Sequence, residues 1–434
     1  MFRTNRINFV TTLLVVFAAC SVFSSKETFA SDAFGVKVGG FIRTDMYWDS
    51  RMTTGPRESM LLFFPRNEQL NEAGKDINAI PNFNWGAMGS RLSASITAPD
   101  FLGAKVTGLT EVEFIGQADA QTNVLRMRHA WVNLDWGKSK LLVGQFWHPM
   151  FRAETMPLCV SLNVGASVGP LARNPQVRFT QALSETFSVQ ATAFTERDFL
   201  SVGPDGGSTV YQKHALVPSA NLTLMHRATD GNFIVGAGAG LKTIKPYNVH
   251  NVRTAERVDG LLSSFAANLF MGCAVGDFTF RLNGFYGGNM SDMMLPGGYA
   301  VLKSTDIDKI REMEYTPFNT LAATLDVGYS VHKNLKIGIS GGMNMNLGTA
   351  DEFAVANSTF TTWGSHINQM MRVAPRATYQ AGRVQFGAEV EFTQAAFGKD
   401  REYINETKTT WQGKWAETTN VSNLRFLLAT TLFF

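Results

Sequence analysis

The sequence alternates between apolar and polar residues in runs that recur from residue 35 to the last residue. In the run 36–48, for example, most even positions are apolar and most odd positions are polar. Successive side chains of a β-strand point to opposite faces, so one face of each run suits lipid and the other suits water. The runs are about ten residues long, which is the length that a tilted strand needs to cross a bilayer. The pattern therefore predicts transmembrane β-strands.

Sixteen strands of this kind are predicted, an even number, as a closed bacterial barrel with both termini on one side requires. The expected fold class is all-β, a closed antiparallel transmembrane β-barrel. The predicted strands are 35–49, 90–98, 103–117, 123–136, 139–147, 174–183, 186–196, 217–228, 232–244, 258–272, 276–287, 318–331, 334–347, 369–380, 383–397 and 418–434.

The predicted connections alternate between short turns and long loops. Turns such as 137–138 and 230–231 consist of residues that favour tight turns. The intervening connections are mostly long, as in 50–89 and 398–417, with 118–122 as the exception. Short periplasmic turns and long extracellular loops are the layout of an outer-membrane barrel.

The composition agrees with a barrel and excludes other classes. Hydrophobic residues make up 45% and charged residues 17%, while the mean hydropathy stays close to zero. A helical membrane protein of this length would be far more apolar, and no segment after the N-terminus offers the roughly 20 apolar residues of a membrane helix. A net charge of +3 is too small to indicate a nucleic-acid partner.

The N-terminus has the features of a secretory signal peptide. Arg3 and Arg6 precede the apolar stretch 9–19, which is too short to span a bilayer as a helix. Cleavage is expected after Ala30, with lipid attachment at Cys20 as the alternative. The predicted domains are a signal peptide, 1–30, and a transmembrane barrel, 31–434.

Two of the strands carry special features. The last strand alternates out to a terminal aromatic residue, Phe434, which resembles the signal read by outer-membrane assembly machinery, although an ordinary edge strand could end in the same way. In 123–136, Arg126 and Arg128 share parity with the apolar Ala130. Either a bulge shifts the register there, or part of the strand is buried against protein.

Three segments resemble the DcaP-like outer-membrane porins, in particular the versions from the Bacteroides group. They are VKVGGFIRTD at 36–45, LRMRHAWV at 125–132 and LLVGQFWHP at 141–149. The resemblance covers about residues 34–185 and is diffuse beyond. It implies a sixteen-stranded homotrimeric barrel that passes small, often anionic solutes. The family commonly has an N-terminal helical extension, whereas only 31–34 precede the first strand here, so a trimer would have to form through barrel walls and loops.

The inward faces of the strands carry more basic than acidic residues, which predicts a lumen that favours anions because arginine binds carboxylate and phosphate groups well. The alternative is that these charges pair with acidic residues such as Asp45, Glu389 and Glu391 and brace the wall. The pore-lining candidates on the strands are Arg43, Arg91, Arg178, Arg281, Arg372 and Arg376.

Two loops contribute further expectations. The connection 148–173 is a candidate constriction loop that folds into the lumen, with Arg152, Glu154 and Arg173 as candidate pore-lining residues; the alternative is an outward surface loop. The apolar run 60–65 in the first loop needs cover. We expect its own loop to supply it, with the barrel rim or a neighbouring subunit as alternatives.

The sequence predicts a channel and no enzyme. The seven histidines are scattered without a partner pattern, and Cys159 and Cys273 form neither a disulfide framework nor a zinc pattern, so no catalytic residue, metal or cofactor is expected. We expect a porin in the outer membrane of a Gram-negative bacterium that allows passive diffusion of small hydrophilic, possibly anionic, solutes. Its partners would be outer-membrane lipid, the solutes and two further copies of the chain. The alternative function is a structural or adhesive barrel with a blocked lumen.

Overall fold

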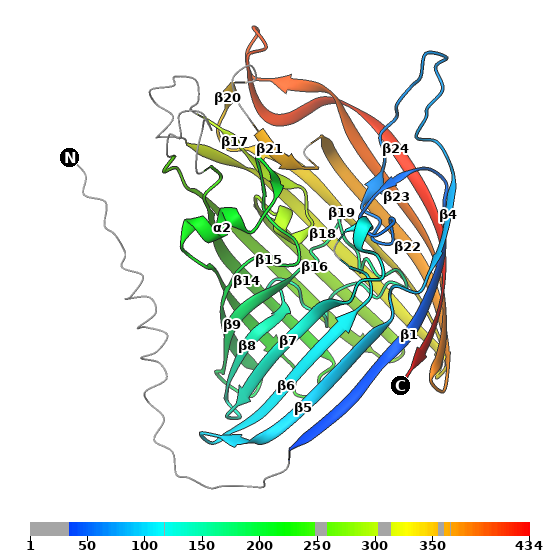
Figure 1. Ribbon diagram of the computed structural model, residues 1–434, viewed down its shortest axis with the longest axis vertical. Helices are drawn as coiled ribbons and strands as arrows, with labels where there is room; N and C mark the ends of the chain where they lie inside the picture. Colours follow the sequence, from blue (N-terminus) through cyan, green and yellow to red (C-terminus); the bar gives the residue numbers. More distant parts are fainter. Residues whose placement is uncertain (1–33, 117, 248–257, 303–313, 355–359, 365) are drawn as a thin grey trace, which may run out of the picture.

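The computed structural model describes residues 34–434, except 117, 248–257, 303–313, 355–359 and 365. Sixteen antiparallel strands close into a tilted barrel (Figure 1). They are β1 (Gly35–Asp49), β5 (Arg91–Phe101), β6 (Ala104–Glu113), β7 (Arg126–Asp135), β8 (Ser139–Trp147), β9 (Arg173–Ala182), β10 (Phe187–Phe194), β13 (Ser219–Arg227), β14 (Phe233–Ile244), β15 (Leu262–Val275), β16 (Phe278–Gly288), β18 (Tyr315–His332), β19 (Leu335–Thr349), β22 (Ile367–Ala381), β23 (Val384–Tyr403) and β24 (Thr410–Phe433).

The first and last strands close the barrel. β1 pairs with β24 in antiparallel register from Phe41 opposite Phe433 to Asp49 opposite Arg425. The backbone of Phe434 exchanges hydrogen bonds with Gly40, at 3.1 and 3.2 Å. Closure leaves the transmembrane sheet without an open edge, which a barrel in lipid requires.

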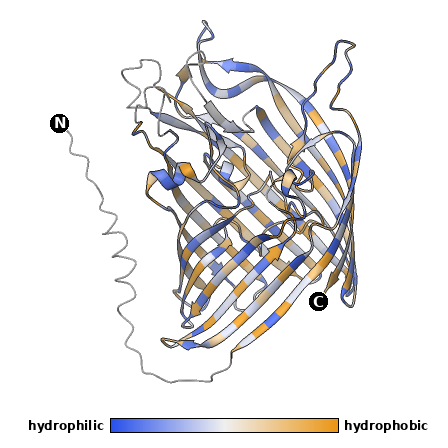
Figure 2. Ribbon diagram, viewed as in Figure 1, coloured by the Kyte–Doolittle hydropathy of each residue, from blue (hydrophilic) through white to orange (hydrophobic). Residues whose placement is uncertain are grey.

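The predicted alternation is confirmed in three dimensions, and Figure 2 shows it as stripes along the strands. Outward side chains such as Val38, Leu269 and Phe386 are 65%, 66% and 55% exposed, as expected for residues that face lipid. Inward positions hold polar side chains that are buried within the protein, including Asn283 and Asp326. The outer face is thus apolar and the inner face polar, as the sequence pattern predicted.

The strands differ from the prediction mainly at the loop end. The loop predicted at 398–417 is wrong, because β23 and β24 continue as a hairpin that leaves only 404–409 between them. Strand formers such as Trp411 and Trp415 continue the pairing, opposite Tyr403 and Arg401. In β7 a register shift between Glu111 and Val112 of its partner strand marks the bulge that was one of the two alternatives for 123–136.

Small elements occupy the long loops. The first loop, 50–90, contains β2 (Thr53–Thr54), β3 (Phe64–Pro65) and β4 (Asn82–Gly86). The third loop, 148–172, contains no helix or strand. The remaining ones are η1 (Asp119–Gln121), β11 (Val202–Gly203), β12 (Gly206–Gly207), α2 (Val210–Ala215), η2 (Ser291–Met293), β17 (Gly297–Val301), β20 (Phe353–Ala354) and β21 (Phe360–Trp363). Across the described part of the chain, the helices are too short or too polar to cross a membrane.

The predictions for the N-terminus stay untested, whereas the positions of the two later cysteines are defined. The signal peptide, its cleavage after Ala30 and lipid attachment at Cys20 lie outside the described residues. Cys159 lies in the connection between β8 and β9, and Cys273 lies near the turn end of β15; both are free thiols.

The alternation of turns and loops makes a topology prediction. Gly206 lies in the exposed β11–β12 hairpin and Gly231 in an exposed turn at the opposite end of the barrel, and a Cβ added at either position would meet no atom within 4 Å. Insertion of an epitope tag should therefore be tolerated at both. We expect antibody to reach the tag at Gly206 on intact cells and the tag at Gly231 only after permeabilisation. The opposite labelling would mean that the barrel has the reverse orientation.

Candidate functional site: a lumen narrowed by inward loops

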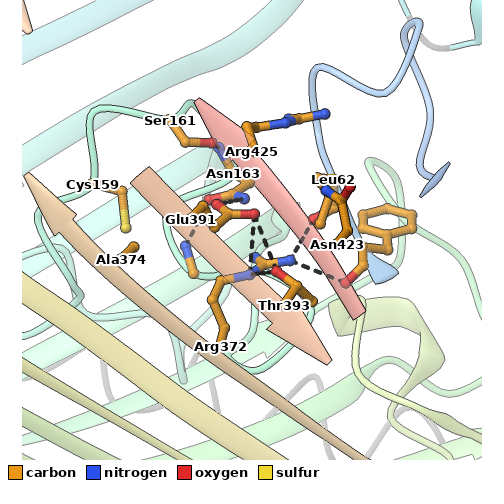
Figure 3. A network of polar contacts seen from close by, with 12 residues as sticks. Leu62, Cys159, Ser161, Asn163, Arg372, Ala374, Glu391, Thr393, Asn423 and Arg425 are labelled. Carbon is orange, nitrogen blue, oxygen red and sulfur yellow. Dashed lines mark hydrogen bonds and ion pairs between the residues drawn. The ribbon is translucent and has the colours of Figure 1, made fainter. Parts of the chain in front are cut away.

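The connection between β8 and β9, residues 148–172, folds into the barrel and binds the opposite wall. The backbone N–H groups of Val160 and Ser161 donate to the carboxylate of Glu389 on β23, at 2.6 and 3.1 Å. The side chain of Asn163 donates to Glu391 on the same strand, at 3.0 Å. Figure 3 shows Asn163 beside Glu391, with Cys159 and Ser161 of the same loop nearby. Loop 148–172 therefore spans the lumen.

Further contacts fix the loop along its length. Asn344 of β19 donates to the carbonyl of Ser167 at 2.6 Å, and Asn283 of β16 donates to the carbonyl of Thr155 at 2.7 Å. Arg43 of β1 donates to the carbonyl of Val160 at 2.6 Å. Irregular backbone needs partners for its polar groups when it is removed from water, and here the inward polar side chains of the wall supply them.

One side of the lumen is filled with apolar side chains. They come from three loops, 50–90, 148–172 and 289–296, and from inward positions of the strands between β16 and β24. Porin lumens are generally polar, so a packed apolar core inside the barrel divides this lumen into a filled side and a polar side. The cluster contains Leu61, Phe63, Phe64, Met150, Phe151, Met156, Ala166, Val168, Leu171, Phe285, Met290, Met293, Met294, Leu295, Ala322, Ile367, Met370, Ala395, Phe397 and Val421.

The opposite side of the lumen, along β5 to β8, remains accessible to solvent. Inward side chains there, such as Ser93, Thr107 and Asn133, are partly exposed, whereas Ala322 and Ala374 on the filled side are buried.

A group of charged residues stands at the loop end of the polar side, with five guanidinium groups and three carboxylates. Arg128 contacts Glu113 at 2.5 Å, and Arg126 contacts Asp198 at 2.7 Å. The excess of two positive charges makes this part of the wall basic. The members are Arg57, Arg91, Arg126, Arg128 and Arg173 with Glu111, Glu113 and Asp198.

Arg152 and Arg178 add to this positive charge. Arg152 donates to Gln190 at 2.8 Å and lies over the ring of Phe270, while Arg178 donates to the carbonyl of Trp147 at 2.7 Å. Within the described part of the chain, neither guanidinium has a carboxylate within ion-pair distance. Their charges are therefore held by neutral acceptors and aromatic rings rather than cancelled.

The other predicted pore-lining residues have partners of opposite charge on the wall or in the loops. Arg91 lies 3.4 Å from Glu113, and Arg173 contacts Asp198. Glu154 points to an exposed contact with Arg227 at 2.9 Å.

The four remaining strand arginines, all on the side from β16 to β1, also form ion pairs with carboxylates. Arg43 contacts Asp45 at 2.5 Å, and Arg372 lies 3.3 Å from Glu391. Asp326 receives both Arg281, at 3.1 Å, and Arg376, at 2.7 Å. Pairing of this kind was the alternative to a solute-facing role.

Sequence reasoning did not select Arg57, Arg126, Arg128 or Asp198. Arg126 and Arg128 did give a signal, because their parity disagreed with the rest of the strand; the bulge turns Arg128 and the adjacent His129 toward the lumen together. Arg57 and Asp198 lie in loops, where no alternation reveals the direction of a side chain.

A second polar group ties two loops to the wall near β14. Lys242 contacts Asp292 at 2.6 Å and lies 3.7 Å from Glu196, which accepts hydrogen bonds from the backbone and the hydroxyl of Ser201. Burial, together with the nearby carboxylate of Asp292, raises the pKa of Glu196 to about 7, against the opposing effect of Lys242. One lysine thus faces two buried carboxylates.

This arrangement predicts that the packing of loop 195–218 depends on pH. The folded pKa of Glu196 lies above its usual value of 4.5, so its protonated form is favoured in the packed loop. The associated stability is fully present below about pH 4.5 and is lost as the pH rises to about 7. We expect limited proteolysis within this loop to be faster at pH 8 than at pH 5. In Glu196→Gln the two rates should become similar, and an unchanged pH dependence in that variant would contradict the assignment.

Comparisons with known proteins agree on the fold. No protein-family model and no curated protein matches the sequence. Among solved structures, the outer membrane channel DcaP of Acinetobacter baumannii is 16% identical, covers 94% of this chain and 100% of its own, and has a TM-score of 0.67. The anion-selective porin from Comamonas acidovorans is 10% identical, with coverage of 93% and 100% and a TM-score of 0.53.

A trimer form of OmpT from Vibrio cholerae is 13% identical, with coverage of 93% and 100% and a TM-score of 0.52. At such identities the likeness concerns the fold. The predicted DcaP-like barrel is confirmed at that level, and the fold is that of Gram-negative outer-membrane proteins.

Proposed function

We propose that this barrel, which has the fold of the outer-membrane porins, is a channel for passive diffusion of small hydrophilic solutes with a preference for anions. The observation that carries the proposal is the division of the lumen. Apolar side chains from three loops and from the strands fill the side between β16 and β24, while partly exposed polar residues line β5 to β7. This arrangement supports a narrow aqueous passage on the side of β5 to β8 as part of the proposal.

The anion preference rests on the uneven distribution of charge. Between β16 and β1 the inward arginines pair with carboxylates, so the field of each arginine is largely cancelled. On the side of β5 to β10 the guanidinium groups outnumber the carboxylates, and Arg152 and Arg178 lie on that side as well. Fixed cations beside a narrow aqueous passage raise the local concentration of anions and repel cations.

A trimer is part of the proposal. It is supported by the trimer form of OmpT, which shares the fold. We place the contacts between subunits on the barrel walls and the loops.

Electrical recording from planar bilayers tests the function. Purified wild-type protein should produce conductance steps, and liposomes that contain it should swell faster in small organic acids than in amines of similar size. A barrel with a blocked lumen is the second candidate, and the packed apolar cluster inside the barrel favours it. Absence of conductance steps from folded protein would support that candidate and overturn the porin proposal.

A further inference from the structure

The first long loop sends an apolar segment into the lumen. Residues 60–65 are all buried. Met60 packs with Met88 of its own loop, the cover expected from the sequence, whereas Leu61, Phe63 and Phe64 join the apolar cluster inside the barrel. Phe63 and Phe64 pack against Trp363, with ring centroids 5.3 and 6.0 Å apart, and Phe64 also lies 6.3 Å from Phe397. The hydroxyl of Ser167 in loop 148–172 donates to the carbonyl of Phe63 at 3.2 Å. The two loops therefore form one packed body.

Arg372 of β22 holds both loops at once. Its Nη2 donates to the carbonyls of Leu62 and Phe63, at 2.9 and 3.0 Å, and its Nη1 donates to the carbonyl of Ala166. Its Nε donates to the hydroxyl of Thr393 at 2.9 Å. Figure 3 shows the guanidinium between the first loop and β23. Hydrogen bonds from a charged donor are the strong ones, so this single side chain acts as a clamp.

Two other wall residues hold the segment just before the apolar run. Arg425 binds Asp49 through two hydrogen bonds, at 2.9 and 2.7 Å, and donates to the carbonyl of Ser59 at 2.8 Å. The hydroxyl of Tyr47 donates to the carbonyl of Glu58 at 2.6 Å. Wall side chains thus bind four carbonyls between Glu58 and Phe63.

The held segment is strained where it enters the lumen. Arg57, Glu58 and Ser59 have φ angles of 62°, 55° and 59°, so three successive residues other than glycine adopt the left-handed conformation. For a residue with a Cβ this conformation is unfavourable relative to the right-handed region. Strain of this kind persists only where surrounding contacts enforce it. Here Tyr47 and Arg425 bind the carbonyls of Glu58 and Ser59, and Asp119 accepts from the backbone N–H groups of Arg57 and Glu58.

We propose that segment 57–65 is a second constriction element, which Arg372 and Arg425 hold inside the lumen next to loop 148–172 and which sets the size limit of the channel. The proposal rests on the proposed porin function. Arg372 is then a positioning residue that fixes the width of the passage through two loops. Its guanidinium does not contact the solute, because it is 3% exposed and its donors are occupied by the loops and the wall.

The decisive experiment compares conductance and size exclusion among four proteins in planar bilayers, with polyethylene glycols of increasing size as probes. They are the wild type, Arg372→Met, a variant in which 60–65 is replaced by alternating glycine and serine, and Arg376→Met. Arg376 is the matched control, because it faces the same lumen from the same strand and carries the same charge but pairs with Asp326. Folding of each protein is checked by its heat-modifiable migration on gels.

In Arg372→Met and in the loop replacement, we expect conductance to rise on the order of twofold and larger polymers to enter, since ion flow follows the cross-section of the passage. Arg376→Met should keep the wild-type size limit. If the wild type conducts and the folded loop replacement has the same conductance and size limit, the second constriction is overturned while the porin function stands. Steps in the loop replacement without steps in the wild type would support segment 57–65 as an obstruction and overturn passive diffusion through the native protein.

Discussion

Gly387→Val is expected to displace loop 148–172 from the wall and widen the passage. A side-chain carbon at Gly387 would lie 2.8 Å from Cγ1 of Val160 and 3.2 Å from its Cγ2, and the nearest atoms all belong to that one loop residue. The clash therefore falls on the loop and spares the wall. Overpacking costs about 1–3 kcal/mol, which changes the ratio of seated to displaced loop by roughly five- to 150-fold.

Single-channel conductance measures this effect. Gly387→Val should give larger and less uniform steps than the wild type, because Val160 and Ser161 lose their geometry toward Glu389. Gly284→Val is the matched control: it is also a strand glycine, but an added carbon there meets no atom within 4 Å. Steps of wild-type size from a folded Gly387→Val protein would show that the loop accommodates the change. The contact at Gly387 would then not determine the position of loop 148–172.

The position of the strands was predictable because lipid and water impose a period of two on every strand that crosses the membrane. That constraint ends where the strand leaves the membrane. The upper part of the β23–β24 hairpin, around Tyr403 and Trp411, therefore lay outside the prediction. Conversely, the break in alternation at Arg126 and Arg128 carried real information, since the bulge in β7 is the physical cause of it.

The partners of the inward charges were not predictable in the same way. Parity correctly indicates that Arg372 points inward, and pairing with Glu391 was one of the alternatives. Its other partners include the carbonyls of Leu62, Phe63 and Ala166, which belong to irregular loops. A carbonyl has no sequence signature, because every residue carries one. An inward arginine thus gives no indication from sequence alone whether it faces solute or holds a loop.

Arg178→Gln is expected to lower the anion preference of the channel. Arg178 lies over the ring of Phe146 and donates to a backbone carbonyl, and glutamine can keep a hydrogen bond there while removing the charge. At about 8 Å from a passing anion in water, one fixed charge contributes about 0.5 kcal/mol, or roughly a twofold change in local anion concentration. The measurement is the reversal potential across a bilayer with a salt gradient, which should move toward the cation-selective direction.

The double variant Arg43→Gln/Asp45→Asn provides the control. It removes an ion pair whose atoms are 2.5 Å apart, so the net charge of the lumen does not change. Selectivity should then stay close to that of the wild type, although the loss of the bond from Arg43 to Val160 loosens loop 148–172. An equal shift in both variants would mean that the width of the passage, rather than the excess charge near Arg178, determines selectivity. A cation preference in the wild type would rule out the anion preference altogether, whichever arginine is substituted.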